Sequence, residues 1–368
     1  MDSFSIDTLV VGAGIVGVAI ARELSLRGVE VVVVEAEPTI GSVVSARNSG
    51  VIHAGLYYKP GGLKARFCVE GRDMLYAYAA ARNIWHRRCG KLVVATDASE
   101  TAALHGLKSN AERNGVGDLA LLTAGRARAL EPELACVEAL HSPSSGQIDV
   151  HELIEALALD AANAGALVQC RARFVSARPR EGGGFSAEIG DDDRYAVECR
   201  QLINAAGLGA QTVAAAIEGF PRGLIPEQAL GKGSYFQWLG RKPPFERLIY
   251  PAPVPKSAGL HCRSDGDGRT VLGPDLEFVD AVDYRVDPAR ARLFFESTRR
   301  FFPALRLEDL AADYAGVRPK LKTGDDFVVQ GVEEHGMAGL LNCFGVDSPG
   351  VTSCMALARA IAEMALEA

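Results

Sequence analysis

Long hydrophobic runs are missing from this 368-residue sequence, in which no segment approaches eighteen uninterrupted apolar residues. A helix that spans a bilayer is therefore not expected. The first apolar segment, residues 6–11, is short and is accompanied by Asp2 and Asp7 instead of lysines, which favours a core strand over a signal peptide. We expect a cytoplasmic protein, and peripheral association with the inner face of a membrane stays open.

An excess of positive charge is also missing, because 39 basic residues stand against 46 acidic ones and give a net charge of −7. This balance argues against a general nucleic-acid-binding surface. The eight cysteines form no C-x-x-C pair, so the sequence predicts buried thiols and neither a zinc site nor a disulfide framework. No metal is expected.

What the sequence does contain is a strand–helix–strand pattern at its start. Residues 6–11 and 29–34 are apolar and rich in β-branched side chains, and residues 15–27 between them predict a helix that Gly28 ends. Glu35 ends the second strand, where a carboxylate can accept hydrogen bonds from a ribose diol. The pattern is typical of a nucleotide-binding unit.

Three glycines, Gly12, Gly14 and Gly17, follow the first strand in the pattern G-x-G-x-x-G. The first allows a tight turn, the second lets a pyrophosphate approach the backbone, and the third lets the helix pack closely on the sheet. The helix start at Ile15 and Val16 offers N–H groups and a partial positive charge to phosphates. The alternative is an ordinary β-α-β unit with a glycine-rich turn.

A second strand-to-glycine transition occurs near residue 205, but Gly207 and Gly209 do not repeat the G-x-G-x-x-G pattern. An enzyme that passes electrons between two dinucleotides through two such folds would need a second copy. We therefore expect one dinucleotide and a small organic substrate.

The stretch from residue 45 to residue 58 combines polar side chains with glycines that permit close backbone approach. Within nine residues it contains Ser45, Arg47, Asn48, Ser49 and His53. This composition suits the lining of a site, and the alternative is a capped loop with incidental polar residues.

The sequence pattern of the chain changes after residue 230. Short apolar runs separated by proline and glycine, at residues 234–239, 248–250, 259–263 and 270–272, predict an antiparallel sheet. Residues 340–352 then predict a strand followed by a glycine-rich helix start, which is again suited to binding an anion or a carbonyl group.

Taken together, these stretches resemble the D-amino-acid-oxidase-like (DAO) superfamily of FAD-dependent oxidoreductases, over nearly the whole chain. The block ARNSGVIHAGLYYKPGGLKARFCVEG at 46–71 is most similar to the L-2-hydroxyglutarate dehydrogenase/oxidase family. The other stretches mark the superfamily: GAGIVG at 12–17, INAAG at 203–207, LIYPAPVP at 248–255, TVLGPD at 270–275, YAGVRPKL at 314–321 and FGVDSPGVTS at 344–353.

The resemblance implies a mixed α/β and α+β fold. It implies a Rossmann-like FAD-binding domain, discontinuous in sequence, from residues 1–85, 145–220 and 325–368. A substrate-binding domain with an antiparallel sheet would comprise residues 86–144 and 221–324.

The resemblance also implies where FAD binds. The glycine turn and Glu35 would hold the ADP part, the loop 45–50 would follow the pyrophosphate and flavin, and Phe174 would reach the adenine through its backbone. The turn at 345–352 would face the pyrimidine edge of the flavin. The expected cofactor-binding residues are Gly12, Gly14, Ile15, Val16, Gly17, Glu35, Ser45, Arg47, Asn48, Ser49, Phe174, Ala206, Gly207, Gly345, Ser348, Pro349, Gly350, Val351 and Thr352.

The implied reaction is FAD-dependent oxidation of a small L-2-hydroxy acid, L-2-hydroxyglutarate to 2-oxoglutarate, by hydride transfer to flavin N5. Such chemistry needs a base for the hydroxyl proton, for which we select His53, and a cation for the carboxylate, for which we select Arg318. Further candidates for substrate contact are Tyr57, Tyr250, His261, Arg318 and Lys320. Each has a structural alternative: a hydrogen bond to flavin, a packed tyrosine, a core histidine or a solvated lysine.

Other functions stay open at this point. The substrate could be an amino acid or glycerol 3-phosphate, although a histidine base favours an alcohol over an amine. A non-catalytic flavoprotein is a third hypothesis. The electron acceptor, oxygen or a quinone, is not fixed by the residues.

Overall fold

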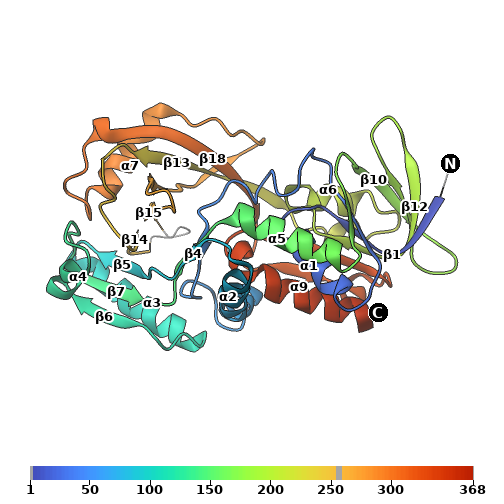
Figure 1. Cartoon of the computed structure of the whole chain (residues 1–368), viewed down its shortest axis with the longest axis horizontal. Helices are drawn as coiled ribbons and strands as arrows, with labels where there is room; N and C mark the ends of the chain where they lie inside the picture. The colour runs from blue at the N-terminus through green and yellow to red at the C-terminus, as the bar shows by residue number, and fades with distance from the viewer. Residues whose placement is uncertain (1–2, 254–258, 368) are drawn as a thin grey trace.

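The computed structural model describes residues 3–253 and 259–367, which form an eight-stranded sheet, a nine-stranded sheet and a three-stranded sheet. In Figure 1 the two large sheets lie in separate lobes, with α7, β13 and β14 in one and α1, β1 and β12 in the other. Both labelled ends of the chain lie in the second lobe.

The eight-stranded sheet has a parallel centre formed by segments from the beginning, middle and end of the chain. Because successive side chains of β1 point to opposite faces of the sheet, Val10 packs in one hydrophobic core while Leu9 and Val11 pack in the other. The parallel strands are β9 (Leu167–Gln169), β2 (Val31–Val34), β1 (Ser3–Val11), β12 (Tyr195–Asn204) and β20 (Leu340–Phe344), and the antiparallel ones are β10 (Phe174–Pro179), β11 (Phe185–Ile189) and β19 (Val328–Gln330).

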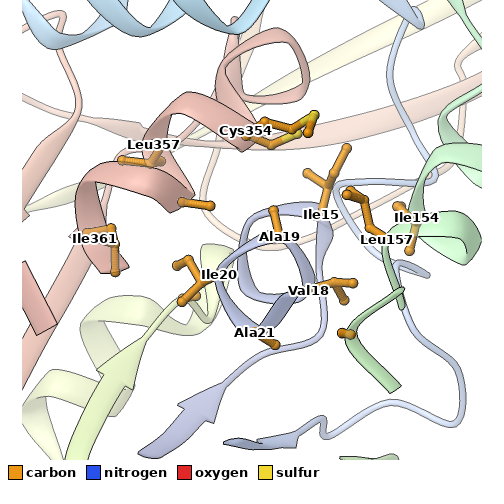
Figure 2. Close-up of a cluster of buried hydrophobic side chains, with 14 of the residues drawn as sticks. Ile15, Val18, Ala19, Ile20, Ala21, Ile154, Leu157, Cys354, Leu357 and Ile361 are labelled. Atoms are coloured by element: carbon orange, nitrogen blue, oxygen red, sulfur yellow. The ribbon is translucent and has the colours of Figure 1, made fainter. Parts of the chain in front are cut away.

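Three helices, α1 (Ile15–Ser25), α5 (Val150–Asn163) and α9 (Gly350–Glu367), share one core with one face of this sheet. Figure 2 shows α1 between the other two, with Leu157 of α5 on one side and Leu357 of α9 on the other. The small Ala19 and Ala21 of α1 let these helices approach closely. Helix α2 (Leu63–Arg82) packs on α9, and α6 (Ala210–Ala215) packs on the opposite face.

The nine-stranded sheet combines two parts of the chain that are far apart in sequence. Its neighbours pair antiparallel except β14 and β5, which are parallel and place Leu248 opposite Lys91. The strand order is β17 (Glu277–Val279), β13 (Gln228–Trp238), β16 (Thr270–Leu272), β15 (Cys262–Ser264), β14 (Leu248–Pro251), β5 (Lys91–Ala95), β7 (Glu138–Ser142) and β6 (Ala120–Thr123), with β18 (Leu310–Leu321) paired to β13.

Shorter elements complete the lobes. The three-stranded sheet contains β3 (Val51–Ile52), β8 (Gly146–Ile148) and β4 (His86–Arg87), and it fixes the chain just before His53. The remaining α-helices are α3 (Thr101–Arg113), α4 (Ala124–Leu130), α7 (Ala291–Thr298) and α8 (Val332–His335). Among residues 3–253 and 259–367, no helix combines the length and the apolar character that crossing a bilayer requires.

The predicted fold class is confirmed. Residues 195–204 form one strand, in which the exposed Arg200 pairs with Asp7 of the neighbouring strand β1. The long strand β18 was not predicted as a strand, since its glycine and proline masked the pattern. The proposed domain boundaries stay a prediction, and the motif at 248–255 ends outside the described residues.

Candidate active site

A cavity of about 2070 Å³ is lined by residues of both large sheets and of the loops around them. It brings together nearly all of the residues selected from the sequence, whereas Gly17 and Gly345 do not line it. The selected residues that do are Gly12, Gly14, Ile15, Val16, Glu35, Ser45, Arg47, Asn48, Ser49, His53, Tyr57, Phe174, Ala206, Gly207, Tyr250, His261, Arg318, Lys320, Ser348, Pro349, Gly350, Val351 and Thr352.

The turn after β1 leaves no room for side chains. Gly12 has a φ of +102°, and a Cβ atom there would lie 2.8 Å from the carbonyl oxygen of Ala205 at the end of β12. Its N–H donates to the carbonyl of Val34 at 2.8 Å, so the ends of β1, β2 and β12 meet at one edge. Ligands of open α/β sheets bind at such an edge. Helix α1 begins at the same edge, directly after Gly14, which has no side chain to cover the helix start.

Gly17 acts from within the packed helix. A Cβ atom on it would lie 1.9 Å from the carbonyl oxygen of Gly12, which means that this glycine lets α1 rest against the turn. Gly345 has a φ of +66°, and a Cβ there would meet the side chain of Leu321. Both glycines therefore shape the walls of the cavity without lining it.

Glu35 holds the glycine turn in place through its carboxylate. One oxygen accepts the N–H of Ala13 at 2.7 Å and the other accepts the N–H of Glu37 at 2.9 Å. Each carboxylate oxygen can accept a further hydrogen bond, and the residue lines the cavity. Glu35 can therefore bind ribose hydroxyls while it keeps its backbone partners.

The loop that contains Ser45 is fixed by its own polar groups. Ser45 Oγ accepts the N–H of Ile15 at the start of α1, at 3.0 Å. Asn48 donates to the carbonyl of Ser45 at 2.6 Å and accepts the N–H of Gly50 at 2.8 Å. The guanidinium of Arg47 lies 4.0 Å from the centre of the Tyr284 ring. The predicted loop thus presents a preformed surface to the cavity.

His53 lies between β3 and the start of α9. Its N–H donates to Thr352 Oγ1 at 3.0 Å, and its Nε2 lies 3.3 Å from Ser348 Oγ. Burial, and then the charge of Lys91, hold the pKa of His53 well below its ordinary value. The imidazole is therefore neutral near pH 7 and can accept a proton.

Arg318 has a charge that no carboxylate balances within the part of the chain that the structure describes. Its Nε donates to the carbonyl of Gly231 at 3.2 Å, and a terminal nitrogen donates to the carbonyl of Asp275 at 2.8 Å. Backbone carbonyls fix the direction of the guanidinium but leave its positive charge available. The arrangement suits a carboxylate bound from the cavity.

Lys320 differs, because its ammonium lies 2.8 Å from Asp347. Lys64 of α2 lies 2.5 Å from the other oxygen of the same carboxylate. Burial raises the pKa of Asp347, but the charges of Lys64 and Lys320 outweigh burial and lower it. The predicted substrate contact of Lys320 stays a prediction, and this arrangement of two lysines around one aspartate was missed from the sequence.

The rings of Tyr250 and His261 stack, with their centres 4.2 Å apart and their planes 3° apart. Neither ring nitrogen of His261 has a hydrogen-bond partner among the described residues, and burial is the largest cause of its strongly lowered pKa. Burial also acts on Tyr57, whose pKa it raises, so that the hydroxyl group keeps its proton. This side of the cavity is therefore a wall of neutral aromatic side chains.

Sequence reasoning missed Lys91, the first residue of β5, which is 0% exposed and lies next to this wall. The only signal was a lysine at the start of the apolar run LVVA, and such a lysine usually marks a strand end in solvent. Within the described residues, no cluster of His, Cys, Asp or Glu is placed to hold a metal ion.

Comparisons with known proteins identify the family of the chain. Residues 7–364 match the model of the DAO family, described as FAD dependent oxidoreductase. The chain is 38% identical to "L-2-hydroxyglutarate dehydrogenase, mitochondrial" of Arabidopsis thaliana, over 97% of this chain and 83% of the relative. It is 30% identical to the Nematostella vectensis protein of the same name, over 98% and 90%. The cytoplasmic location stays a prediction, since these relatives are named as mitochondrial.

Two further matches are to a dehydrogenase and an oxidase of glycerol phosphates. "Glycerol 3-phosphate dehydrogenase" of Caloramator mitchellensis is 28% identical, over 95% of this chain and 72% of the relative. A solved structure of L-alpha-glycerophosphate oxidase from Mycoplasma pneumoniae with FAD bound superimposes with a TM-score of 0.89 at 23% identity, over 100% of this chain and 95% of that one. At this identity the superposition establishes the fold.

The cofactor fits the residues that are present. The glycine turn has open backbone where a pyrophosphate would lie, Glu35 has oxygen lone pairs for a ribose, and the start of α9 lines the same cavity. The expectation of FAD is confirmed by the family match and by the FAD-bound structural neighbour. The chain belongs to the DAO family of FAD-dependent oxidoreductases.

Proposed function

We propose that this protein oxidises a small L-2-hydroxy acid, with L-2-hydroxyglutarate as its substrate and 2-oxoglutarate as its product. The observation that carries the proposal is that a neutral His53 and an Arg318 without a carboxylate partner among the described residues line the same cavity. The names of the Arabidopsis and Nematostella relatives support the same substrate.

The proposed base is His53, and the proposed proton acceptor is its Nε2. Nδ1 is buried without a hydrogen-bond partner, whereas Nε2 lies beside Ser348, which lines the cavity. A neutral imidazole at this position takes the hydroxyl proton as the carbon–hydrogen bond breaks. FAD, when bound, supplies the acceptor for the hydride.

Arg318 is the proposed partner of the carboxylate next to the hydroxyl group. Its guanidinium is fixed from behind by the carbonyls of Gly231 and Asp275, so little side-chain entropy is lost when a substrate binds. A planar guanidinium group in this position can bind a carboxylate through two parallel hydrogen bonds, so it orients the substrate as well as attracting it.

A second candidate substrate is glycerol 3-phosphate, which the name of the Caloramator relative favours. A phosphate could occupy the position of the carboxylate on Arg318. Amino acids remain a third class, but a neutral amine needs no base such as His53. Oxygen and a quinone are the candidate electron acceptors.

The test is anaerobic reduction of the purified flavoprotein. L-2-hydroxyglutarate, D-2-hydroxyglutarate, glycerol 3-phosphate and a panel of amino acids are added separately while the flavin absorbance near 450 nm (roughly, for an oxidised flavin) is recorded. We expect bleaching by L-2-hydroxyglutarate and not by the other compounds. If only another compound bleaches the flavin, that compound is the substrate and L-2-hydroxyglutarate is not. If no compound does, the result favours a non-catalytic flavoprotein.

A further inference from the structure

Lys91 is a buried lysine whose charge has no partner in the described part of the chain. The residue is 0% exposed, and its ammonium makes no hydrogen bond. Burying a charged group without a partner is costly, which makes a lysine in this position a candidate for a functional role. The proposed reaction assigns no role to it.

The ammonium of Lys91 lies directly against the aromatic wall of the cavity. It is 4.0 Å from the centre of the Tyr250 ring and 5.5 Å from the centre of the Tyr57 ring. Both tyrosines line the cavity, whereas Lys91 does not. The lysine is therefore held behind the wall by the faces of two rings.

The other ionisable groups that act on Lys91 do not balance its charge. They are the thiols Cys68 of α2 and Cys89 before β5, and burial raises the pKa of both, so both are neutral near pH 7. Lys91 in turn contributes to lowering the pKa values of His53 and His261. Among the described residues, no carboxylate contributes to the shift in the pKa of Lys91.

Two other cations near the wall form no ion pair with a carboxylate within residues 3–253 and 259–367, although the charge of Asp265 acts on Arg263 at longer range. Arg263 donates to the hydroxyl of Tyr314 at 3.0 Å, and Arg318 donates to backbone carbonyls. His261 is influenced by the charges of Lys91, Arg263 and Arg318 together. The wall thus carries more positive charge than one carboxylate bound to Arg318 would neutralise.

We propose that Lys91 is a specificity-determining residue that selects a 2-hydroxy acid with a second carboxylate over the matching monocarboxylate. This inference rests on the proposed function. With the first carboxylate on Arg318, the second lies against the aromatic wall, where Tyr57 offers a hydroxyl group that has no other partner among the described residues. A carboxylate bound in front of the rings favours the protonated form of Lys91, which then supplies the counter-charge from behind the rings. The attraction is strengthened because water is excluded from this buried place.

The experiment compares two substrates that differ in one group. L-2-hydroxyglutarate and L-2-hydroxyvalerate have the same five-carbon chain, and the second has a methyl group in place of the distal carboxylate. Anaerobic stopped-flow measurement gives the flavin reduction rate constant divided by the dissociation constant for each substrate. We expect Lys91→Met to lower the ratio of the two values by at least about tenfold, chiefly through the dissociation constant of L-2-hydroxyglutarate.

Two further variants separate a specific role from a structural one. Tyr57→Phe removes the proposed donor to the distal carboxylate and should lower the same ratio, which keeps the test available if Lys91→Met does not fold. Lys232→Met is the control, because Lys232 is buried in the same sheet but pairs with Asp283 at 3.1 Å. In Lys232→Met, the ratio of the values for L-2-hydroxyglutarate and L-2-hydroxyvalerate should stay within about twofold of the wild-type ratio.

A second readout is binding of the product in place of turnover. Lys91→Met should weaken binding of 2-oxoglutarate but leave binding of 2-oxovalerate within about threefold. Equal losses for both ligands, or an unchanged ratio in Lys91→Met and Tyr57→Phe, would overturn the role of Lys91. If neither hydroxy acid reduces the wild-type flavin, it is the proposed function that fails.

Discussion

Thr352 connects His53 to the C-terminal helix through one hydroxyl group. Its Oγ1 accepts the N–H of His53 at 3.0 Å and donates to the carbonyl of Val51 at 3.2 Å. The candidate base is therefore positioned by a side chain nearly 300 residues later in the sequence. These hydrogen bonds join the proposed catalytic residue to the proposed flavin-binding turn.

Replacing Thr352 with valine should remove both hydrogen bonds of the Thr352 hydroxyl group while the volume of the side chain stays nearly the same. Thr352 is 0% exposed, so the N–H of His53 would lose its acceptor in a buried place, and we expect about 1–3 kcal/mol lower free energy of unfolding. Flavin reduction should slow as well. The control is Ser353→Ala, because the adjacent Ser353 hydroxyl is buried without a partner among the described residues, and its loss should cost no more than about 0.5 kcal/mol. Equal effects of the two variants would contradict this role.

His53→Ala should retain FAD and slow flavin reduction at least about a hundredfold, since general base catalysis contributes that much or more. Rapid-mixing absorbance measurements under anaerobic conditions give the rate constant, and the visible spectrum reports the bound flavin. His151→Ala is a suitable control, because His151 is exposed on α5, where its side chain lies 3.2 Å from Glu155, and it does not line the cavity. A His53→Ala protein that reduces its flavin at the normal rate would remove this histidine from the mechanism.

Arg318→Ala should act mainly on substrate binding. Loss of a charge-assisted pair costs about 1.5–3 kcal/mol, which raises the dissociation constant by roughly 10- to 150-fold. Arg318→Lys should recover only part of this loss, because a lysine lacks the planar fork and its contacts to the carbonyls of Gly231 and Asp275. Titration of the flavin spectrum with 2-oxoglutarate measures both variants. Unchanged binding in Arg318→Ala would place the carboxylate elsewhere.

Gly17→Ala should disrupt the nucleotide-binding unit, because the new methyl group would lie 1.9 Å from the carbonyl oxygen of Gly12. We expect loss of FAD or failure to fold, seen as colourless or insoluble protein. Gly106→Ala provides the opposite case inside α3, where a Cβ atom meets nothing within 4 Å. It should stabilise the protein by about 0.5–1 kcal/mol. A yellow and stable Gly17→Ala protein would contradict the packing described here.

Lys91 should give the stability of the protein a specific pH dependence. Burial lowers the pKa of Lys91 from its ordinary value of 10.5 to about 7. Between about pH 7 and pH 10 the unfolded chain therefore binds more protons than the folded one, and the free energy of unfolding rises with pH. Relative to Lys91→Met, the wild type should gain at most about 1.4 kcal/mol per pH unit in this range. Denaturant unfolding of both proteins at pH 7, 8 and 9 measures the difference, and a constant difference would mean that Lys91 keeps its proton.

Local patterns were sufficient to predict the nucleotide-binding unit. The spacing of Gly12, Gly14 and Gly17 and the acid at the end of β2 follow from the geometry of one turn and one helix start, so they are visible in a short window. The cap of α5 is a feature of the same local kind, because Asp149 accepts the N–H of Glu152 three residues later at 3.0 Å. Such features depend on neighbours in sequence.

The parts that could not be predicted depend on contacts between distant segments. Lys91 looks like an ordinary strand end until β14 places the ring of Tyr250 over it. In the same way, Lys320 looks like a free cation until Asp347 and Lys64 are brought beside it. Burial and pairing of a charge are set by the tertiary fold, and one sequence contains no direct record of them.

The position of α1 between α5 and α9 has a consequence for synthesis of the chain. Ile20 and Ala21 of α1 share their core with α9, which comes much later in the sequence. This core is complete only once residues 350–367 have been made, so until then the growing chain exposes the apolar side chains of α1. Binding of these side chains by a chaperone during synthesis would protect the chain from aggregation.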